Sequence, residues 1–213
     1  MVYPITKRLL FPIYQLWLGK VRGVENIPKD GSFIIAANHL SYYDSSLLHS
    51  IIIPEIDRKI HCMVNNRYWN NKIAASILDW GGCFPIYVSG NSKKKNDKSF
   101  DKAFEYLKKK DPVQIYPEGL RSVDGKLQKG KTGIVRLALS AKTPILPIGI
   151  IGSNKVLPKG SFFLRFKRCA VNIGKPIYLD KYYKRKKTKK LFRQLTDKVM
   201  KEIAKLSGQE YNP

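Results

Sequence analysis

Short apolar runs alternate along this chain with segments whose apolar residues recur at helical spacing. The runs at residues 32–37, 60–64, 84–88, 113–116 and 144–151 have the length and composition of buried strands. Strands that alternate with helices are typical of α/β domains with a parallel or mixed sheet. The sequence therefore predicts a single α/β domain, in which helices flank a mixed, largely parallel sheet.

Helical spacing of apolar residues predicts helices at residues 45–53, 69–80, 100–107, 130–141 and 188–206. The first of these is expected to end before Pro54, because proline interrupts a helix. A polar stretch at 89–97 predicts a loop, and residues 164–173 predict one or two further strands. We expect the domain to cover residues 21–206, between a membrane-interface helix at 1–20 and a tail at 207–213.

The N-terminal apolar run, residues 9–18, is about half as long as the ~20 residues that a membrane-spanning helix needs. Lys7, Arg8 and Lys20 flank it, which is typical of a helix lying in the membrane interface. The side chains expected to contact the membrane are Leu10, Phe11, Tyr14 and Trp17. The alternative is a first helix packed on the core of the domain itself.

The chain is strongly basic, with 40 Lys and Arg against 16 Asp and Glu and a net charge of +24. Such a charge indicates a polyanionic partner, which is nucleic acid, an anionic membrane or a phosphate-bearing substrate, unless the lysines only solvate the surface. The hydrophobic fraction of 43% excludes a disordered basic tail. The densest basic stretches are residues 93–110 and 181–201, and we expect both to contact an anionic bilayer.

The three cysteines, Cys62, Cys83 and Cys169, form no CxxC pair and lie in apolar stretches. They are expected to be buried thiols rather than a disulfide framework or a zinc site. Because the chain has only three histidines, a His-rich metal cluster is not expected.

Residues 38–44, Asn-His-Leu-Ser-Tyr-Tyr-Asp, directly follow the predicted strand at 32–37. His39 therefore leaves the carboxyl end of a strand, where active sites of open α/β sheets tend to lie. A turn can bring Asp44 to one imidazole nitrogen, which raises the basicity of the other nitrogen and makes a general base for a hydroxyl. Alternatively, Ser41 caps a helix, Asp44 interacts with the helix dipole, and His39 is only a buried polar residue.

Residues 116–122, Tyr-Pro-Glu-Gly-Leu-Arg-Ser, also follow a predicted strand. A glycine turn beside Arg121 is a candidate phosphate cradle. Lys129 and Lys131 add positive charge where the next predicted helix begins, and a helix N-terminus also favours anions. The alternative is an ordinary turn with solvated charges.

Together, the two motifs and the roughly eighty residues between them resemble the glycerolipid acyltransferases, most closely the class that acylates 1-acylglycerol 3-phosphate. Residues 22–31 resemble the segment that leads into the histidine motif of that family. Residues 129–133 and 144–147 resemble two later blocks. The resemblance extends from about Val21 to Leu206.

The resemblance implies that His39 activates the acceptor hydroxyl and that Asp44 orients His39. The hydroxyl would attack the thioester of acyl-CoA or acyl-carrier protein without an acyl-enzyme, a metal or a further cofactor. Lysophosphatidic acid would thereby become phosphatidic acid. The residues expected to bind the acceptor, with Arg121 on its phosphate, are Glu118, Gly119, Arg121, Ser122, Lys129 and Lys131.

Two positions depart from the pattern of that family. Asn65 stands where the family often has a lysine, and Tyr87 stands where it often has an arginine. Two cations that would hold an acceptor phosphate are therefore missing, and Arg67 or the lysines at 93–95 are candidates to replace them. The acceptor is thus either lysophosphatidic acid or another lysophospholipid or alcohol.

The expected partners are an anionic membrane surface, a lysophospholipid acceptor and an acyl donor, with the protein peripheral or monotopic on the cytoplasmic side. No nucleic-acid motif accompanies the basic residues of 181–201, so nucleic acid is not expected as a partner. A nucleic-acid-binding protein and a catalytically silent, membrane-binding relative remain the alternatives.

Overall fold

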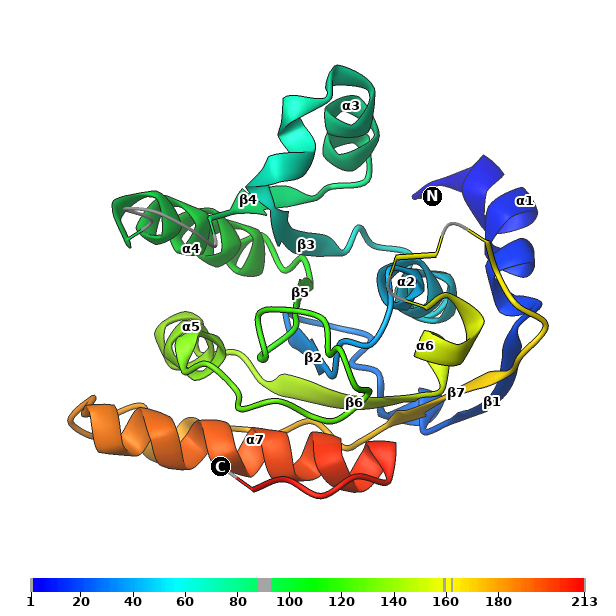
Figure 1. The fold of residues 1–213 in the computed structure, drawn as a ribbon. Helices are drawn as coiled ribbons and strands as arrows, with labels where there is room; N and C mark the ends of the chain where they lie inside the picture. Colours follow the sequence, from blue (N-terminus) through cyan, green and yellow to red (C-terminus); the bar gives the residue numbers. More distant parts are fainter. Residues whose placement is uncertain (1, 88–92, 159, 162, 213) are drawn as a thin grey trace.

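The computed structural model describes residues 2–87, 93–158, 160–161 and 163–212. Seven strands in this part of the chain form one sheet (Figure 1). They are β1 (Leu18–Arg22), β2 (Ile34–Ala37), β3 (His61–Asn65), β4 (Phe84–Ile86), β5 (Val113–Ile115), β6 (Ile145–Ile151) and β7 (Cys169–Ile173).

The strand order is β1-β7-β6-β2-β5-β3-β4. Neighbouring strands are parallel except β6 and β7, which are antiparallel. The predicted mixed, largely parallel sheet is therefore confirmed.

The helices lie before, between and after these strands. They are α1 (Pro4–Gln15), α2 (Tyr43–Ile56), α3 (Lys72–Trp80), α4 (Lys93–Lys108), α5 (Gly133–Ala141), α6 (Ser153–Val156) and α7 (Lys189–Ser207). Short 3₁₀ turns are η1 (Val24–Asn26), η2 (Asn66–Asn70) and η3 (Asp180–Tyr182).

Helices cover both faces of the sheet (Figure 1). Along β2, Ile34 and Ala36 join the apolar cluster of α4, α5 and α7, whereas Ile35 and Ala37 join the cluster of α1 and α2. All four side chains are fully buried. Burial on both faces explains why the strands read as continuous apolar runs rather than as alternating ones.

Helix α2 continues through Pro54 to Ile56, so the prediction that it ends before Pro54 is wrong. Proline has no N–H to donate to the carbonyl of Ser50, four residues earlier. The Gln15 side chain supplies that donor instead, with Nε2 2.8 Å from the Ser50 carbonyl. The Ser50 carbonyl therefore keeps a hydrogen-bond partner, which the sequence around Pro54 alone does not provide.

The predicted boundary at residue 20 falls inside a strand. Helix α1 ends at Gln15, and β1 pairs with β7 at the edge of the sheet. The predicted tail also packs on the domain, because Tyr211 is buried and its hydroxyl donates to Asp197 over 2.8 Å. The described residues before the predicted boundary, and Tyr211 of the predicted tail, therefore pack on the same folded unit.

Three further boundaries differ from the prediction. The segment predicted as one helix at 69–80 is split, because Asn71 caps α3 by accepting from the N–H groups of Ile73 and Ala74. Helix α4 begins at Lys93, inside the predicted loop at 89–97, of which residues 89–92 lie outside the described part. From 164–173, only residues 169–173 are in a strand.

The aromatic residues of the N-terminal segment, Phe11, Tyr14 and Trp17, pack against the domain. Phe11 is 5% exposed, and Tyr14 and Trp17 pack against the same apolar cluster of α2 and the sheet. The prediction that Phe11 contacts the membrane is therefore wrong, because this side chain is buried in the domain. Tyr14 and Trp17 are half-buried, and Leu10, at 44% exposed, faces outward, so their contact with a membrane stays a prediction. The exposed face of the N-terminal segment consists of Ile5, Leu9, Leu10, Ile13 and Leu16. In the described residues, no helix combines the length and apolar character that crossing a bilayer requires.

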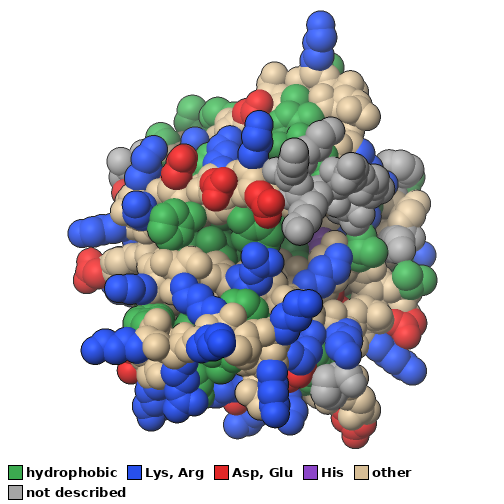
Figure 2. All heavy atoms as spheres, turned by 90° about the vertical axis from the view of Figure 1, so that its left-hand side faces the viewer, with side chains coloured by type: hydrophobic (Ala, Val, Ile, Leu, Met, Phe, Trp, Pro, Cys, Tyr) green, Lys and Arg blue, Asp and Glu red, His purple; other side chains and the backbone are tan. Residues whose placement is uncertain are grey.

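Lys and Arg side chains crowd the face formed by α4, α5 and the beginning of α7, where Asp and Glu are fewer (Figure 2). Nine of the ten basic residues in 181–201 are exposed, and the tenth, Arg193, pairs with Asp197. Helix α1 lies on the other side of the domain (Figure 1). The basic face and the apolar face of α1 are therefore two separate surfaces rather than one continuous patch.

Candidate functional site

The two predicted motifs meet at the carboxyl edge of the sheet. Strands β2 and β5 are parallel neighbours, with Ala36 opposite Ile115. His39 and Glu118 each lie three residues after one of these paired positions, so both lie just beyond the same edge of the sheet. The His39 N–H donates to Glu118 Oε1 over 2.8 Å, and the Ser122 N–H donates to the His39 carbonyl over 2.8 Å. The sheet register thus places the two loops side by side.

The imidazole of His39 is held by Asp44. Nδ1 of His39 lies 2.8 Å from Asp44 Oδ2, and the Asp44 side chain is fully buried. Oδ2 also accepts from the N–H groups of Leu40 and Ser41, and Oδ1 accepts from the Ser153 hydroxyl over 2.5 Å. The Asp44 carboxylate acts as a hydrogen-bond acceptor toward all of these groups, so His39 Nδ1 must be a donor. In the neutral imidazole the proton is therefore assigned to Nδ1. The lone pair on Nε2 is then available to take a proton.

Tyr116 fixes the plane of the His39 ring. The two rings are stacked, with centroids 3.8 Å apart and planes 9° apart. The Tyr116 hydroxyl lies 2.9 Å from Ser45 Oγ and accepts from Gln114 Nε2 over 2.7 Å. Burial raises the pKa of Tyr116 well above its usual value, so the phenol stays neutral. The sequence places Tyr116 in the motif but does not predict this stacking.

Asn38 anchors the loop that carries His39. Its fully buried side chain donates from Nδ2 to the Ile150 carbonyl over 2.9 Å and accepts from the Ile150 N–H over 2.7 Å. Strand β2 ends at Ala37, and beyond it the side-chain amide of Asn38 makes the two hydrogen bonds to β6 that a backbone peptide group would make. The sequence signal is a polar residue that directly follows an apolar strand.

Glu118 connects the two loops. Oε1 accepts from the His39 N–H and Oε2 from the Gln128 N–H, each over 2.8 Å. The side chain is only 5% exposed. Backbone donors thus contact both oxygens of Glu118, and direct binding of the acceptor by Glu118 stays a prediction. The Glu118 side chain links the loop of His39 to the segment of Gln128.

Burial raises the pKa of Glu118 from 4.5 to about 7, against the opposing effect of its two backbone hydrogen bonds. Because the folded-state pKa is the higher one, the folded protein keeps this proton while the unfolded chain loses it. We expect the free energy of unfolding to fall as pH rises from about 4.5 to about 7, by on the order of 3 kcal/mol from this group. Urea unfolding across this range should show that slope in the wild type and a smaller one in Glu118→Gln. Parallel slopes in both proteins would contradict the assignment.

Arg121 lies against the His39 loop. Its guanidinium stacks on the Tyr42 ring, with Cζ 3.3 Å from the ring centroid. Nη1 is buried and has no hydrogen-bond partner among the described residues. An unsatisfied buried donor on a charged group is costly, and an oxygen of an anionic ligand is the type of atom that satisfies it.

The remaining predicted binding residues divide into two groups. Gly119 has a positive φ of 77°, and a Cβ there would lie 2.6 Å from Lys131 Nζ, so the lysine ammonium rests against the glycine turn. Ser122 is buried and donates to Asp124 Oδ1 over 3.0 Å, so it shapes the loop. Lys129 is exposed and lies near Asp197 of α7, and among the described residues no contact joins it to the His39 loop. The structure thus gathers Gly119, Arg121 and Lys131 but not Lys129.

The described residues contain no group of three or more His, Cys, Asp or Glu side chains arranged to hold a metal ion. Cys62 and Cys169 are buried free thiols, and Cys83 is a half-buried one. Burial raises the pKa of Cys169 to about 11. The expectation of buried thiols is therefore confirmed for Cys62 and Cys169.

Comparisons with known proteins identify similar acyltransferases. The family model described as Acyltransferase matches residues 19–151, which is more than half of the chain. A chloroplastic 1-acyl-sn-glycerol-3-phosphate acyltransferase of Brassica napus is 27% identical over 79% of this chain and 48% of its own length. A 1-acyl-sn-glycerol-3-phosphate acyltransferase of Bacillus subtilis is 29% identical over 75% of this chain and 73% of its own length.

The fold is similar to the crystal structure of the 1-acyl-sn-glycerophosphate acyltransferase PlsC of Thermotoga maritima. The TM-score is 0.70 at 20% sequence identity, over 98% of this chain and 84% of the other. This likeness confirms the predicted fold class. The chain spans about half of the length of the Brassica napus relative.

Proposed function

The chain belongs to the acyltransferase family, and on that premise we propose that it transfers a fatty acyl group to the free hydroxyl of lysophosphatidic acid, giving phosphatidic acid. The observation that carries this proposal is the His39–Asp44 pair at the carboxyl edge of the sheet, with Nδ1 2.8 Å from Oδ2. The names of the curated relatives support the choice of acceptor.

In the proposed reaction, His39 Nε2 takes the proton of the acceptor hydroxyl as its oxygen attacks the carbonyl carbon of a thioester. Asp44 stabilises the imidazolium that forms, because its buried carboxylate stays on the Nδ1 side. The tetrahedral intermediate then loses the thiolate as the C–S bond breaks. The proton on Nε2 passes to the departing sulfur, so that His39 returns to its starting state. The donor is acyl-CoA or acyl-carrier protein.

The acceptor phosphate is proposed to bind Arg121, with Lys131 nearby. Arg121 adjoins the His39 loop by stacking on Tyr42, and Lys131 contacts the neighbouring motif loop at Gly119. A guanidinium is suited to phosphate because it presents several donors in one plane.

The test is release of free thiol from acyl-CoA, and from acyl-carrier protein, with a panel of acceptors. We expect turnover with lysophosphatidic acid to exceed turnover with zwitterionic lysophospholipids or with monoacylglycerol. If the protein prefers another lysophospholipid, the proposed acceptor is wrong and the proposed acyl-transfer reaction stands. Vesicle binding without transfer to any acceptor would identify a catalytically silent relative and would refute the proposal.

We also propose that the protein works at a membrane surface, which it contacts through the exposed face of α1. Leu9 and Ile13, at 62% and 49% exposed, lie on this face, and the exposed cation Arg8 lies beside them. Lys7 is not available for lipid headgroups, because it forms an ion pair with Asp57. A short apolar face flanked by positive charge is typical of a helix that lies in the interface.

The double substitution Leu9→Glu with Ile13→Glu should weaken binding to anionic vesicles by about 10-fold or more, since each apolar side chain contributes on the order of 1 kcal/mol or more when it leaves water. Co-sedimentation with vesicles measures this binding. Tyr178→Glu, at a position 64% exposed in the segment after β7, is the matched control and should bind as the wild type does. Equal sedimentation of all three proteins would contradict a role for α1.

A further inference from the structure

Arg67 lies beside the candidate acceptor site, although the motif pattern does not include it. Its Nη2 donates to the Tyr68 hydroxyl over 2.9 Å and to the Tyr42 hydroxyl over 3.3 Å. Tyr42 carries Arg121 on its ring. Two guanidinium groups therefore converge on one tyrosine, three residues after His39 in the chain.

The position of Arg67 is a consequence of Asn65. Asn65 ends β3, and its side chain caps η2 by accepting from the Arg67 N–H over 3.1 Å. The asparagine thus starts the 3₁₀ turn that carries Arg67 toward Tyr42. This cap fixes the backbone of Arg67 at the start of η2, from which its side chain reaches Tyr42.

Neither guanidinium is neutralised by the protein. Among the described residues, no carboxylate forms an ion pair with Arg67 or Arg121. The pKa of Tyr42 is lowered, first by its hydrogen bond with Tyr68 and, to a smaller extent, by Arg121 and Arg67, against the opposing effect of burial. Unpaired cations that lie close together favour a dianionic ligand such as a phosphate monoester.

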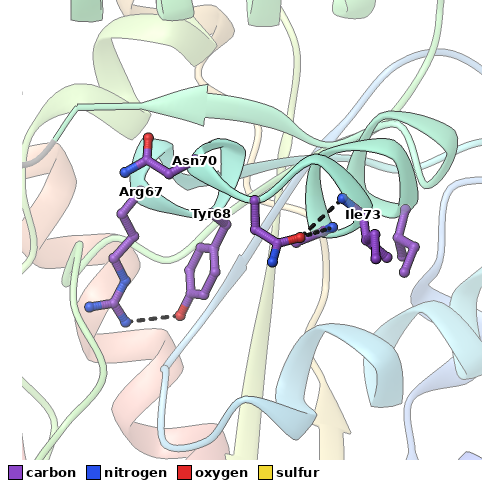
Figure 3. Close-up of a pocket in the computed structure, with 7 residues that line it drawn as sticks. Arg67, Tyr68, Asn70 and Ile73 are labelled. Atoms are coloured by element: carbon purple, nitrogen blue, oxygen red, sulfur yellow. Dashed lines mark hydrogen bonds between the residues drawn. The ribbon is translucent and has the colours of Figure 1, made fainter.

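A groove of about 500 Å³ begins at Arg67 and Tyr68 and continues along α3 (Figure 3). Arg67 and Tyr68 project side by side from η2, and Ile73 lies toward the other end of the groove (Figure 3). The far end is apolar, being lined by Ile73, Ala74 and Ile77, and the two isoleucines are 75% and 62% exposed. This volume is within the range of about 300–1,000 Å³ found for small-molecule sites.

A groove with a cation at one end and an apolar wall at the other complements a single-chain phospholipid. We propose that Arg67 is the second phosphate-binding cation of the acceptor site, beside Arg121, and that the acceptor's acyl chain lies along Ile73 and Ile77. The inference rests on the proposed function, because it names where that acceptor binds. The other candidate cations, Lys93–Lys95, begin α4, and their side chains lie outside those that the structure describes.

The experiment compares Arg67→Gln, Arg67→Lys and Lys72→Gln with the wild type. Lys72 is the matched control, because it is an exposed cation at the start of α3 that does not line the groove. Arg67→Gln should raise KM for lysophosphatidic acid by about 10-fold or more and change kcat little, since it removes a contact made before and during the reaction. Arg67→Lys should restore part of the loss. Transfer to monoacylglycerol, which has no phosphate, should be unaffected.

The chain-binding half of the groove is tested with Ile73→Glu and Ile77→Glu combined. We expect KM to rise for long-chain lysophosphatidic acid and to stay at the wild-type value for a short-chain form. An unchanged KM in Arg67→Gln, or an equal rise in Lys72→Gln, would overturn the proposal.

Titration calorimetry with lysophosphatidic acid separates this inference from the proposed function. If the wild type transfers no acyl group but binds the lipid, weaker binding by Arg67→Gln supports the site and equal binding refutes it. If the wild type does not bind the lipid at all, the site is also refuted.

Discussion

Replacing His39 by alanine is expected to lower kcat/KM for acyl transfer by at least about 100-fold while the protein stays folded. The imidazole of His39 lies between the two motif loops, and its Nδ1 is held by the buried carboxylate of Asp44, which leaves Nε2 to take a proton. A positioned base contributes about 10²–10⁴ to a rate, so its removal should leave only the contribution of substrate binding.

The matched control for His39→Ala is Ser153→Ala. Ser153 donates to Asp44 Oδ1 over 2.5 Å and does not reach His39 itself. Asp44 keeps its bonds from the backbone and from His39 in this variant, so we expect a loss of about 10-fold or less. Thermal melting shows whether each variant is folded, and thiol release measures turnover. A His39→Ala protein with wild-type turnover would show that the dyad assignment is wrong.

The meeting of the two motifs was predictable because it depends on the order and direction of strands. A buried parallel strand ends at the same edge as its neighbour, and both motifs directly follow such strands. The pairing of His39 with Asp44 depends only on the turn between them. Both features depend on strand order or on a short turn, and both can be predicted from one sequence.

The role of Glu118 was not predictable from its motif. Its second oxygen accepts from the Gln128 N–H, ten residues away, and that contact exists only once the loop has folded back. An acidic residue beside glycine and arginine has the same sequence pattern whether it faces a substrate or closes a loop. Only the placement of the backbone donors separates these two roles.

The orientation of α1 was also beyond the sequence. Apolar residues cover much of its surface, so the pattern does not say which face is buried. Phe11 turns inward because α2 and the sheet offer it an apolar surface, and the aliphatic residues Leu9 and Ile13 remain outside. A preference of aromatic side chains for the interface does not outweigh burial in the core of the domain.

Replacing Asn38 by alanine should reduce the free energy of unfolding by about 2–4 kcal/mol, which is a large part of the stability of a typical domain. The variant leaves both the N–H and the carbonyl of Ile150 without the partners that the side-chain amide supplies at 2.7 and 2.9 Å. Asn38 is fully buried, so water does not readily replace these bonds. Urea unfolding measures the loss.

The same substitution should also lower kcat on the folded fraction, because Asn38 sets the point where the main chain leaves the sheet toward His39. Asn172→Ala is the matched control, since its side chain makes one bond, to the Leu206 carbonyl over 2.7 Å, on β7. It should cost about 1 kcal/mol and leave kcat unchanged. If Asn38→Ala lost stability but kept its kcat, then Asp44 and Glu118 alone would hold His39 in place. If both variants lost kcat equally, the effect would come from general loosening of the sheet and not from the anchor beside His39.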